Sequence, residues 1–90
     1  MNKFQSVNIT GAGTTTIAKD QSLLGIVTIN KASAQTITIY DGQDAATGKV
    51  LATLPASAAV GSYHYFIECQ KGITVVAAAS YAGDCTISFV

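Results

Sequence analysis

The chain contains no arginine and no tryptophan, and only one proline and one histidine. Charged residues make up 11% of the sequence, against about 25% in an average domain. Nucleic-acid surfaces are basic and rich in arginine, whereas this chain has five basic and five acidic residues and no net charge, so we expect no nucleic-acid partner. An apolar run of about 20 residues and a basic amphipathic helix are also missing, so we expect no membrane partner.

The N-terminal residues 1–6 lack the apolar segment of a secretory signal, and we therefore expect the protein to be assembled in a cytoplasm. Its 90 residues predict a single domain, 1–90, in which residues 1–20 form an N-terminal arm or edge strands. Hydrophobic residues make up 49% of the chain. With so few charges to cover this content, we expect part of the surface to be buried against neighbouring subunits.

Apolar and polar residues alternate with a period of two, which predicts about eight short strands separated by turn residues. The candidate strands are residues 4–10, 14–19, 23–30, 35–41, 49–54, 62–69, 73–79 and 85–90. Helical spacing of apolar residues is missing, and residues 56–59, after Pro55, would form one turn at most. The sequence therefore predicts an all-β fold, for which we favour a two-sheet antiparallel β-sandwich of jelly-roll or Greek-key type over a single barrel.

Two of these segments support more specific expectations. Residues 23–30 are almost continuously apolar, which predicts a central strand covered on both faces. Residues 85–90 form an apolar strand at the end of the chain. We expect this strand either to be covered by the N-terminal strand or to offer a free edge that completes the sheet of a partner.

Few residues are candidates for chemistry. The Gly11-Ala12-Gly13 turn lacks the Gly-Lys-Ser/Thr that completes a phosphate loop. Asp41, Asp44 and Asp84 provide too few oxygens at the alternating spacing of a calcium loop, and they suit turns. His64 and Glu68 share a strand face but would lie about 13 Å apart. We therefore expect no catalytic residue, no cofactor and no metal, and hence no enzyme.

Cys69 and Cys85 lack the spacing of a metal site. If the last three strands formed a meander, the two residues would lie roughly 20 Å apart, well beyond the Cα separation of about 7 Å that a disulfide allows. We therefore expect both to be small, buried apolar residues, although a Greek-key crossing would leave a disulfide open.

Aromatic residues are the remaining candidates for a functional surface. The tyrosines either pack in the core with their hydroxyl groups reaching solvent, or they anchor a protein interface. For an interface we select Tyr63, Tyr65 and Tyr81, together with Phe4 in the N-terminal arm. An alternative is a carbohydrate-binding module in which Tyr40 and residues 41–47 form the site, but the absence of tryptophan weakens this alternative.

Between residues 23 and 90, the rhythm of strands and turns resembles that of small structural proteins of tailed bacteriophages. The segments that carry the resemblance are residues 24–30, 36–42, 48–54, 63–65, 71–76 and 84–89. The resemblance is one of strand and turn pattern and includes no active-site motif.

This resemblance implies a virion component, most specifically a capsid decoration or cement protein on the outer surface of the head. Such proteins are commonly homotrimers of small β domains that clamp neighbouring subunits of the major capsid protein. The family has no catalytic residues. A tail, connector or fibre-associated protein is the alternative within the same family of structures.

Overall fold

The computed structural model describes residues 4–43 and 48–90. Its strands are β1 (Gln5–Ile9), β2 (Gly13–Ala18), β3 (Ser22–Lys31), β4 (Ile37–Asp41), β5 (Lys49–Leu54), β6 (Gly61–Cys69), β7 (Ile73–Ala77) and β8 (Asp84–Phe89). Each lies within two residues of a strand expected from the sequence. The described ranges contain no helix with the length and apolarity needed to span a membrane.

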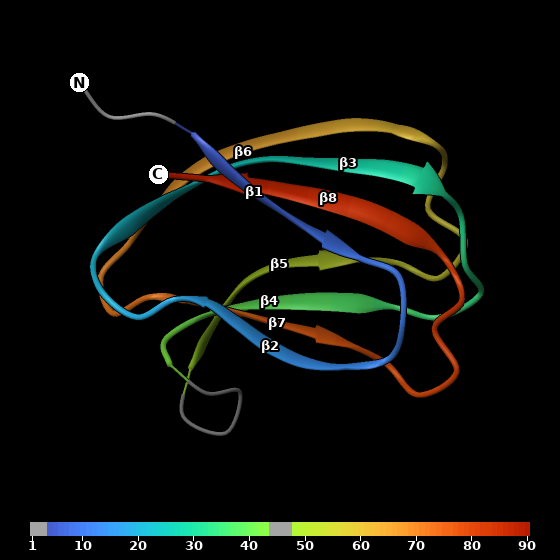
Figure 1. Ribbon diagram of the computed structural model, residues 1–90, viewed down its shortest axis with the longest axis horizontal. Helices are drawn as coiled ribbons and strands as arrows, with labels where there is room; N and C mark the ends of the chain where they lie inside the picture. The colour runs from blue at the N-terminus through green and yellow to red at the C-terminus, as the bar shows by residue number, and fades with distance from the viewer. Residues whose placement is uncertain (1–3, 44–47) are drawn as a thin grey trace.

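The strands form two four-stranded antiparallel sheets, and this confirms the predicted β-sandwich (Figure 1). One sheet has the order β1-β8-β3-β6 and the other β2-β7-β4-β5. The chain changes sheet at every connection except the β4–β5 hairpin, and this is the jelly-roll arrangement. A meander of the last three strands is therefore wrong. β7 pairs with β2 and β4, whereas β6 and β8 belong to the other sheet.

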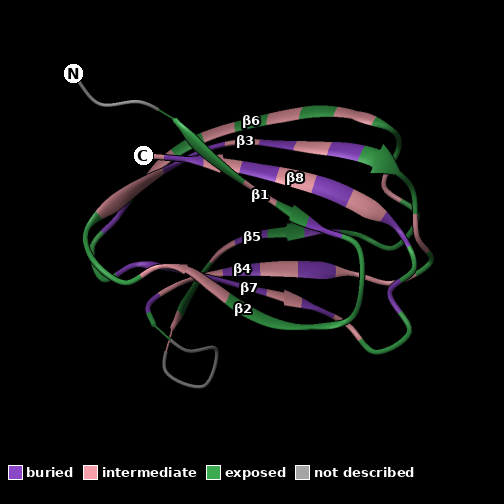
Figure 2. Cartoon of the chain, in the orientation of Figure 1, coloured by how far each residue is buried: buried purple, intermediate pink, exposed green. Residues whose placement is uncertain are grey.

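Alternate residues of both sheets face each other and form one apolar core, which Figure 2 shows as bands of buried and exposed residues along the strands. The largest side chains with less than 2% exposure are Leu24, Ile37, Ile39, Ile73 and Ile87. They come from β3, β4, β7 and β8, which are the inner strands of the two sheets. The core therefore lies between these four strands.

β3 is almost continuously apolar because it contains a β-bulge, and not because both of its faces are covered, as the sequence predicts. Between Leu24 and Val27, β3 has one residue more than its partner β8, and such a bulge changes which face a residue points to. Both residues are consequently buried in the core although they are three positions apart. The strand is central, but it is not covered on both faces along its whole length, because Thr28 is half-buried and Asn30 is exposed.

The C-terminal strand β8 is covered on both sides, because it lies between β1 and β3. Val90 continues this pairing, since its backbone N and O exchange hydrogen bonds with Leu23 at 3.0 and 2.9 Å. Of the two alternatives for this strand, the free edge is wrong and coverage by the N-terminal strand is confirmed. The outer strands of the sandwich are β1 and β6 in one sheet and β2 and β5 in the other.

Candidate functional site

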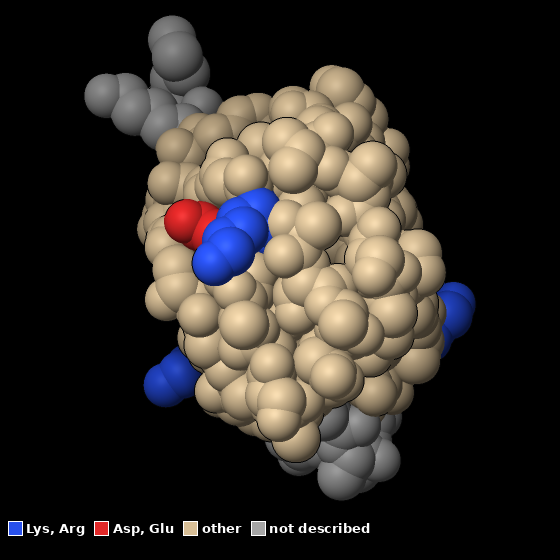
Figure 3. Space-filling view, turned by 90° about the vertical axis from the view of Figure 1, so that its right-hand side faces the viewer, with Lys and Arg blue, Asp and Glu red and all other residues tan. Residues whose placement is uncertain are grey.

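Four connections meet at one end of the sandwich, on the right of Figure 1, and none of them contains a charged residue. They are residues 10–12, 32–36, 55–60 and 78–83, which we call the alanine-rich end. Figure 3 views this end face on and shows it almost free of charged side chains. Lys31 and Asp84 are cross-strand partners at its border.

Most side chains of the alanine-rich end are small and exposed. Val60 is 65% exposed, more than any other large hydrophobic residue described. The exposed alanines are Ala12, Ala32, Ala34, Ala56, Ala59, Ala79 and Ala82. Alanine loses no side-chain rotamer freedom when it is buried. A partner could therefore cover this surface at a low cost in side-chain entropy and without desolvating a charge.

Ser33 connects three of these segments by accepting hydrogen bonds. The Ser33 hydroxyl accepts the backbone N–H of Gln35 at 3.2 Å and that of Ala82 at 3.3 Å. The Ser33 carbonyl accepts the N–H of Ser57 at 2.6 Å. Ser57 and Ser80 also have positive φ values of 60° and 69°, which suit tight turns. These contacts make the alanine-rich end a preformed surface.

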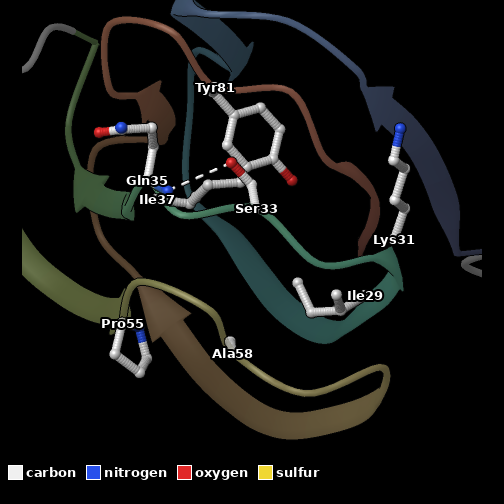
Figure 4. Close-up of a pocket in the computed structure, with 8 residues that line it drawn as sticks. All are labelled: Ile29, Lys31, Ser33, Gln35, Ile37, Pro55, Ala58 and Tyr81. Atoms are coloured by element: carbon white, nitrogen blue, oxygen red, sulfur yellow. Dashed lines mark hydrogen bonds between the residues drawn. The ribbon is translucent and has the colours of Figure 1, made fainter.

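Beneath this surface lies a cavity of about 10 Å³ (Figure 4). It is lined by Ile29, Lys31, Ser33, Gln35, Ile37, Pro55, Ala58 and Tyr81. A volume of this size holds about one water molecule and is far below the roughly 300 Å³ of a small-molecule site. Binding at this end would therefore use its outer surface.

The four residues selected for an interface differ in how much surface they offer. Phe4 is 55% exposed, and its ring lies over Gly25, where an added Cβ would come within 2.6 Å of it. Tyr63 and Tyr65 are half-buried and pack against the core, and the Tyr63 hydroxyl donates to the Ala59 carbonyl at 2.7 Å. Tyr81 is only 7% exposed, so it supports the alanine-rich end from below.

Phe66 and Val60 are exposed but are not among the interface residues selected from the sequence. Phe66 is 53% exposed and has a positive φ of 50°, which is uncommon for a bulky residue. It lies in a bulge where β6 has one residue more than β3. His64 is exposed on the same face, with its ring centroid 6.0 Å from that of Phe66. The strand pattern places Phe66 on the outer face, but local sequence does not reveal the bulge.

At the end of the sandwich opposite the alanine-rich end, Asp41 of β4 forms hydrogen bonds with the β6–β7 turn. Its carboxylate accepts the backbone N–H groups of Gln70 at 3.0 Å and Lys71 at 2.9 Å. The N–H of Lys71, more than any other group, lowers the pKa of Asp41 below its ordinary value of 3.8. Asp41 also borders an open, polar depression of about 430 Å³ whose other lining residues are Lys19, Asp20, Gly42, Gln43, Gln70 and Lys71.

Replacing Asp41 by asparagine should lower the free energy of unfolding by about 1–3 kcal/mol at neutral pH, because one charge-assisted hydrogen bond is lost and another weakened. The pKa is lower in the folded than in the unfolded state, so ionised Asp41 stabilises the fold. This contribution is present above the unfolded pKa, about 3.9, and disappears as the pH falls through the lower folded value.

Urea unfolding of wild type and Asp41→Asn at neutral and strongly acidic pH measures this difference. The difference should be largest at neutral pH and shrink in acid. Asp20→Asn is the matched control, because the backbone carbonyl of Asp20 accepts the Ser22 hydroxyl and is kept in the variant. An equal loss of stability in both variants would contradict the assigned role of Asp41.

Of the other two aspartates considered for a metal site, Asp84 has hydrogen-bond partners and Asp44 lies outside the described residues. Asp84 Oδ1 accepts the side-chain amides of Asn8 at 2.7 Å and Asn30 at 3.3 Å. Asp44, and with it most of the 41–47 carbohydrate loop, lies outside the described residues. Tyr40 is half-buried and is the cross-strand partner of Thr74. In the part of the chain that is described, no three His, Cys, Asp or Glu side chains gather as a metal site.

Cys69 and Cys85 are free thiols with 0% exposure, and this confirms the prediction that both are buried apolar residues. Along β3, Cys69 pairs with Ser22 and Cys85 with Ile29, so the two thiols lie near opposite ends of the sandwich. Burial raises the pKa of each thiol. Both therefore remain protonated and poorly reactive at neutral pH.

Comparisons with known proteins show the fold but no family. No family model matches the chain, and no curated protein matches its sequence. The crystal structure of the Drosophila NLP core, described in terms of pentamer formation and histone binding, is similar with a TM-score of 0.56 and 14% identity, over 97% of both chains. A structure of Bacillus endospore appendages, which form disulfide-linked pili, has the same TM-score and identity and covers 97% of this chain and 82% of that one.

Proposed function

We propose that this protein is a structural component of a bacteriophage virion, specifically a capsid decoration protein. In this proposal it binds the outer surface of the head as a homotrimer and stabilises the lattice of the major capsid protein. The alanine-rich end is the surface that contacts the capsid. The function requires neither a cofactor nor a catalytic residue.

The observation that carries the proposal is the alanine-rich end itself. Four segments far apart in the sequence form one exposed surface without a charged side chain, and Ser33 holds three of them in place. Charged residues are depleted at the centres of protein interfaces. In its lack of charge, although not in its alanine and serine content, the surface matches the centre of a contact with another protein.

Two further observations favour an assembly role. The strand and turn pattern of residues 23–90 resembles small phage structural proteins. The similar solved structures are described as a pentamer and as pili, so this kind of sandwich is used in repeated assemblies. On a capsid, many weak contacts of one kind add up through symmetry, so a small domain can bind tightly when several copies are linked.

The test is co-sedimentation of the purified protein with phage capsids that lack it. Wild type should sediment with the capsids. Ala79→Lys should bind about 5- to 150-fold more weakly, because it places an unpaired charge in the contact, at a cost of about 1–3 kcal/mol. Co-sedimentation and a binding isotherm measure the change.

Gln70→Lys is the matched control, because it adds the same charge to an exposed position at the opposite end and should bind like wild type. Binding of wild type to tail tubes or fibres but not to heads would move the protein to another part of the virion. A wild type that binds no virion component, or equal binding by both variants to capsids, would reject the proposal in its present form.

A further inference from the structure

The two sides of the sandwich that carry the outer strands have unpaired backbone edges. β1 and β2 form one side, where Gln5 of β1 and Ile17 of β2 line a common depression. β6 and β5 form the other, where Leu51 and Tyr63 pack against the same core. Figure 1 looks along the shortest axis of the molecule, with β1 and β2 nearest the viewer. We call these the β1/β2 side and the β5/β6 side.

Neither side has the charges that usually prevent edge-to-edge pairing. β1 and β2 contain no charged residue, and β5 and β6 contain one each, Lys49 and Glu68, near the strand ends. Monomeric proteins usually protect outer strands with lysines, prolines or inward-pointing charges. β-Bulges also protect outer strands, and β2, β5 and β6 each contain one. Pairing with another strand would therefore use β1 and the regular parts of β2, β5 and β6.

Exposed apolar side chains concentrate on the β5/β6 side. Four large hydrophobic residues of the described chain are exposed, and three of them are on β5 or β6 or next to β6. They are Val50 at 51%, Val60 at 65% and Phe66 at 53%. The fourth, Phe4, directly precedes β1. Contact between the two sides would cover the part of this apolar surface that lies next to the strand edges.

The direction of the strands determines which partner fits these edges. Neighbouring strands in both sheets are antiparallel and each sheet has four, so its first and last strands run in opposite directions. A second copy placed beside the first in the same orientation would bring its β1 antiparallel to β6 and, at the same time, its β2 antiparallel to β5. A single placement of the second copy therefore extends both sheets.

We propose that copies of this chain associate head to tail, with the β5/β6 side of one copy against the β1/β2 side of the next. The regular part of β6 before its bulge, residues 61–64, is one residue shorter than the five-residue β1. The side has an outline of at most 33 by 29 Å, comparable with the roughly 800 Å² per partner of a stable interface. Such a contact closes into a ring or continues as a filament.

This inference rests on the self-association in the proposed function but not on capsid binding, so it is tested on the full chain without capsids. Light scattering during size-exclusion chromatography should give wild type a mass several times the monomer's 9.2 kDa. Val50→Lys blocks the β5/β6 side and Thr15→Lys blocks the β1/β2 side, and both residues are exposed. Each variant alone should be a monomer.

An equimolar mixture of the two variants provides the most specific result. Val50→Lys keeps an intact β1/β2 side and Thr15→Lys keeps an intact β5/β6 side, so the mixture should form a heterodimer with twice the monomer mass and nothing larger. Ala79→Lys, at the alanine-rich end, should retain the wild-type oligomer. Circular dichroism verifies that each variant keeps the wild-type fold.

A second measurement tests the contact without any substitution. Backbone amides of β1, β2, β5 and β6 should exchange with solvent more slowly in concentrated wild type than in dilute wild type, because pairing covers them. Monomeric wild type at all concentrations, full-size oligomers from both single variants, or a mixture that forms no heterodimer would overturn the head-to-tail contact. Monomeric wild type that still binds capsids would reject this contact while leaving the capsid proposal in place.

Discussion

Replacing Gly72 by alanine is expected to destabilise the protein more than any other single change considered for its turns. Gly72 has a φ of 134°, a conformation that residues with a side chain rarely adopt. An added Cβ would also lie 2.4 Å from the backbone oxygen of Ala18, which cannot move without displacing β2. Strain and overpacking each cost about 1–3 kcal/mol, so we expect a total loss of roughly 2–6 kcal/mol.

Thermal or urea unfolding measures this effect, and the same change at Gly11 is the control. An added Cβ at Gly11 meets no atom within 4 Å, so Gly11→Ala should change the free energy of unfolding by less than about 1 kcal/mol. Similar stability of Gly72→Ala and wild type would show that the β6–β7 turn tolerates a side chain. That result would contradict the close packing of Gly72 against the backbone of Ala18 in β2.

Replacing Ile39 by alanine should lower the free energy of unfolding by about 2–5 kcal/mol, because it leaves a cavity in the core. Ile39 has 0% exposure and lies on β4, where it pairs with Ala52 and Val75. A domain of 90 residues has a total stability of about 5–13 kcal/mol. The variant is therefore expected to lose a large fraction of the total stability and to unfold at a clearly lower temperature than wild type.

The matched change is Ile39→Val, which removes one methylene group and should cost about 0.5–1.5 kcal/mol. Urea unfolding monitored by circular dichroism gives all three stabilities, and dilute samples keep self-association from adding to them. Equal effects of valine and alanine at this position would contradict a closely packed core around Ile39.

The strands could be predicted from the sequence because the alternation of side chains is a local property. In residues 35–41, for example, Ile37 and Ile39 face the core and Thr38 and Tyr40 the outside, as their order requires. Pairing is not local. β8 lies beside β1, the strand farthest from it in the sequence, and no pattern within residues 73–90 distinguishes this arrangement from a meander. The bulge at Leu24–Val27 was hidden for a similar reason, since it depends on the register with β8.

The alanine-rich end was hidden in the sequence because it is divided among four loops. Each loop alone has the composition of an ordinary turn. The signal that could have revealed it is the distribution of charge, because all four loops at this end lack charged residues while the β2–β3 and β6–β7 connections contain Lys19, Asp20 and Lys71. Recognising that difference requires the order of the strands, which determines the loops that meet.

The jelly-roll order places the start of β1 and the finish of β8 at the pole opposite the alanine-rich end (Figure 1). A peptide or protein joined genetically to either terminus would therefore project away from that end. If the alanine-rich end attaches to a particle, such a payload would stand outward in solvent. The domain would then serve as a display scaffold that accepts cargo at both termini without obstructing its attachment.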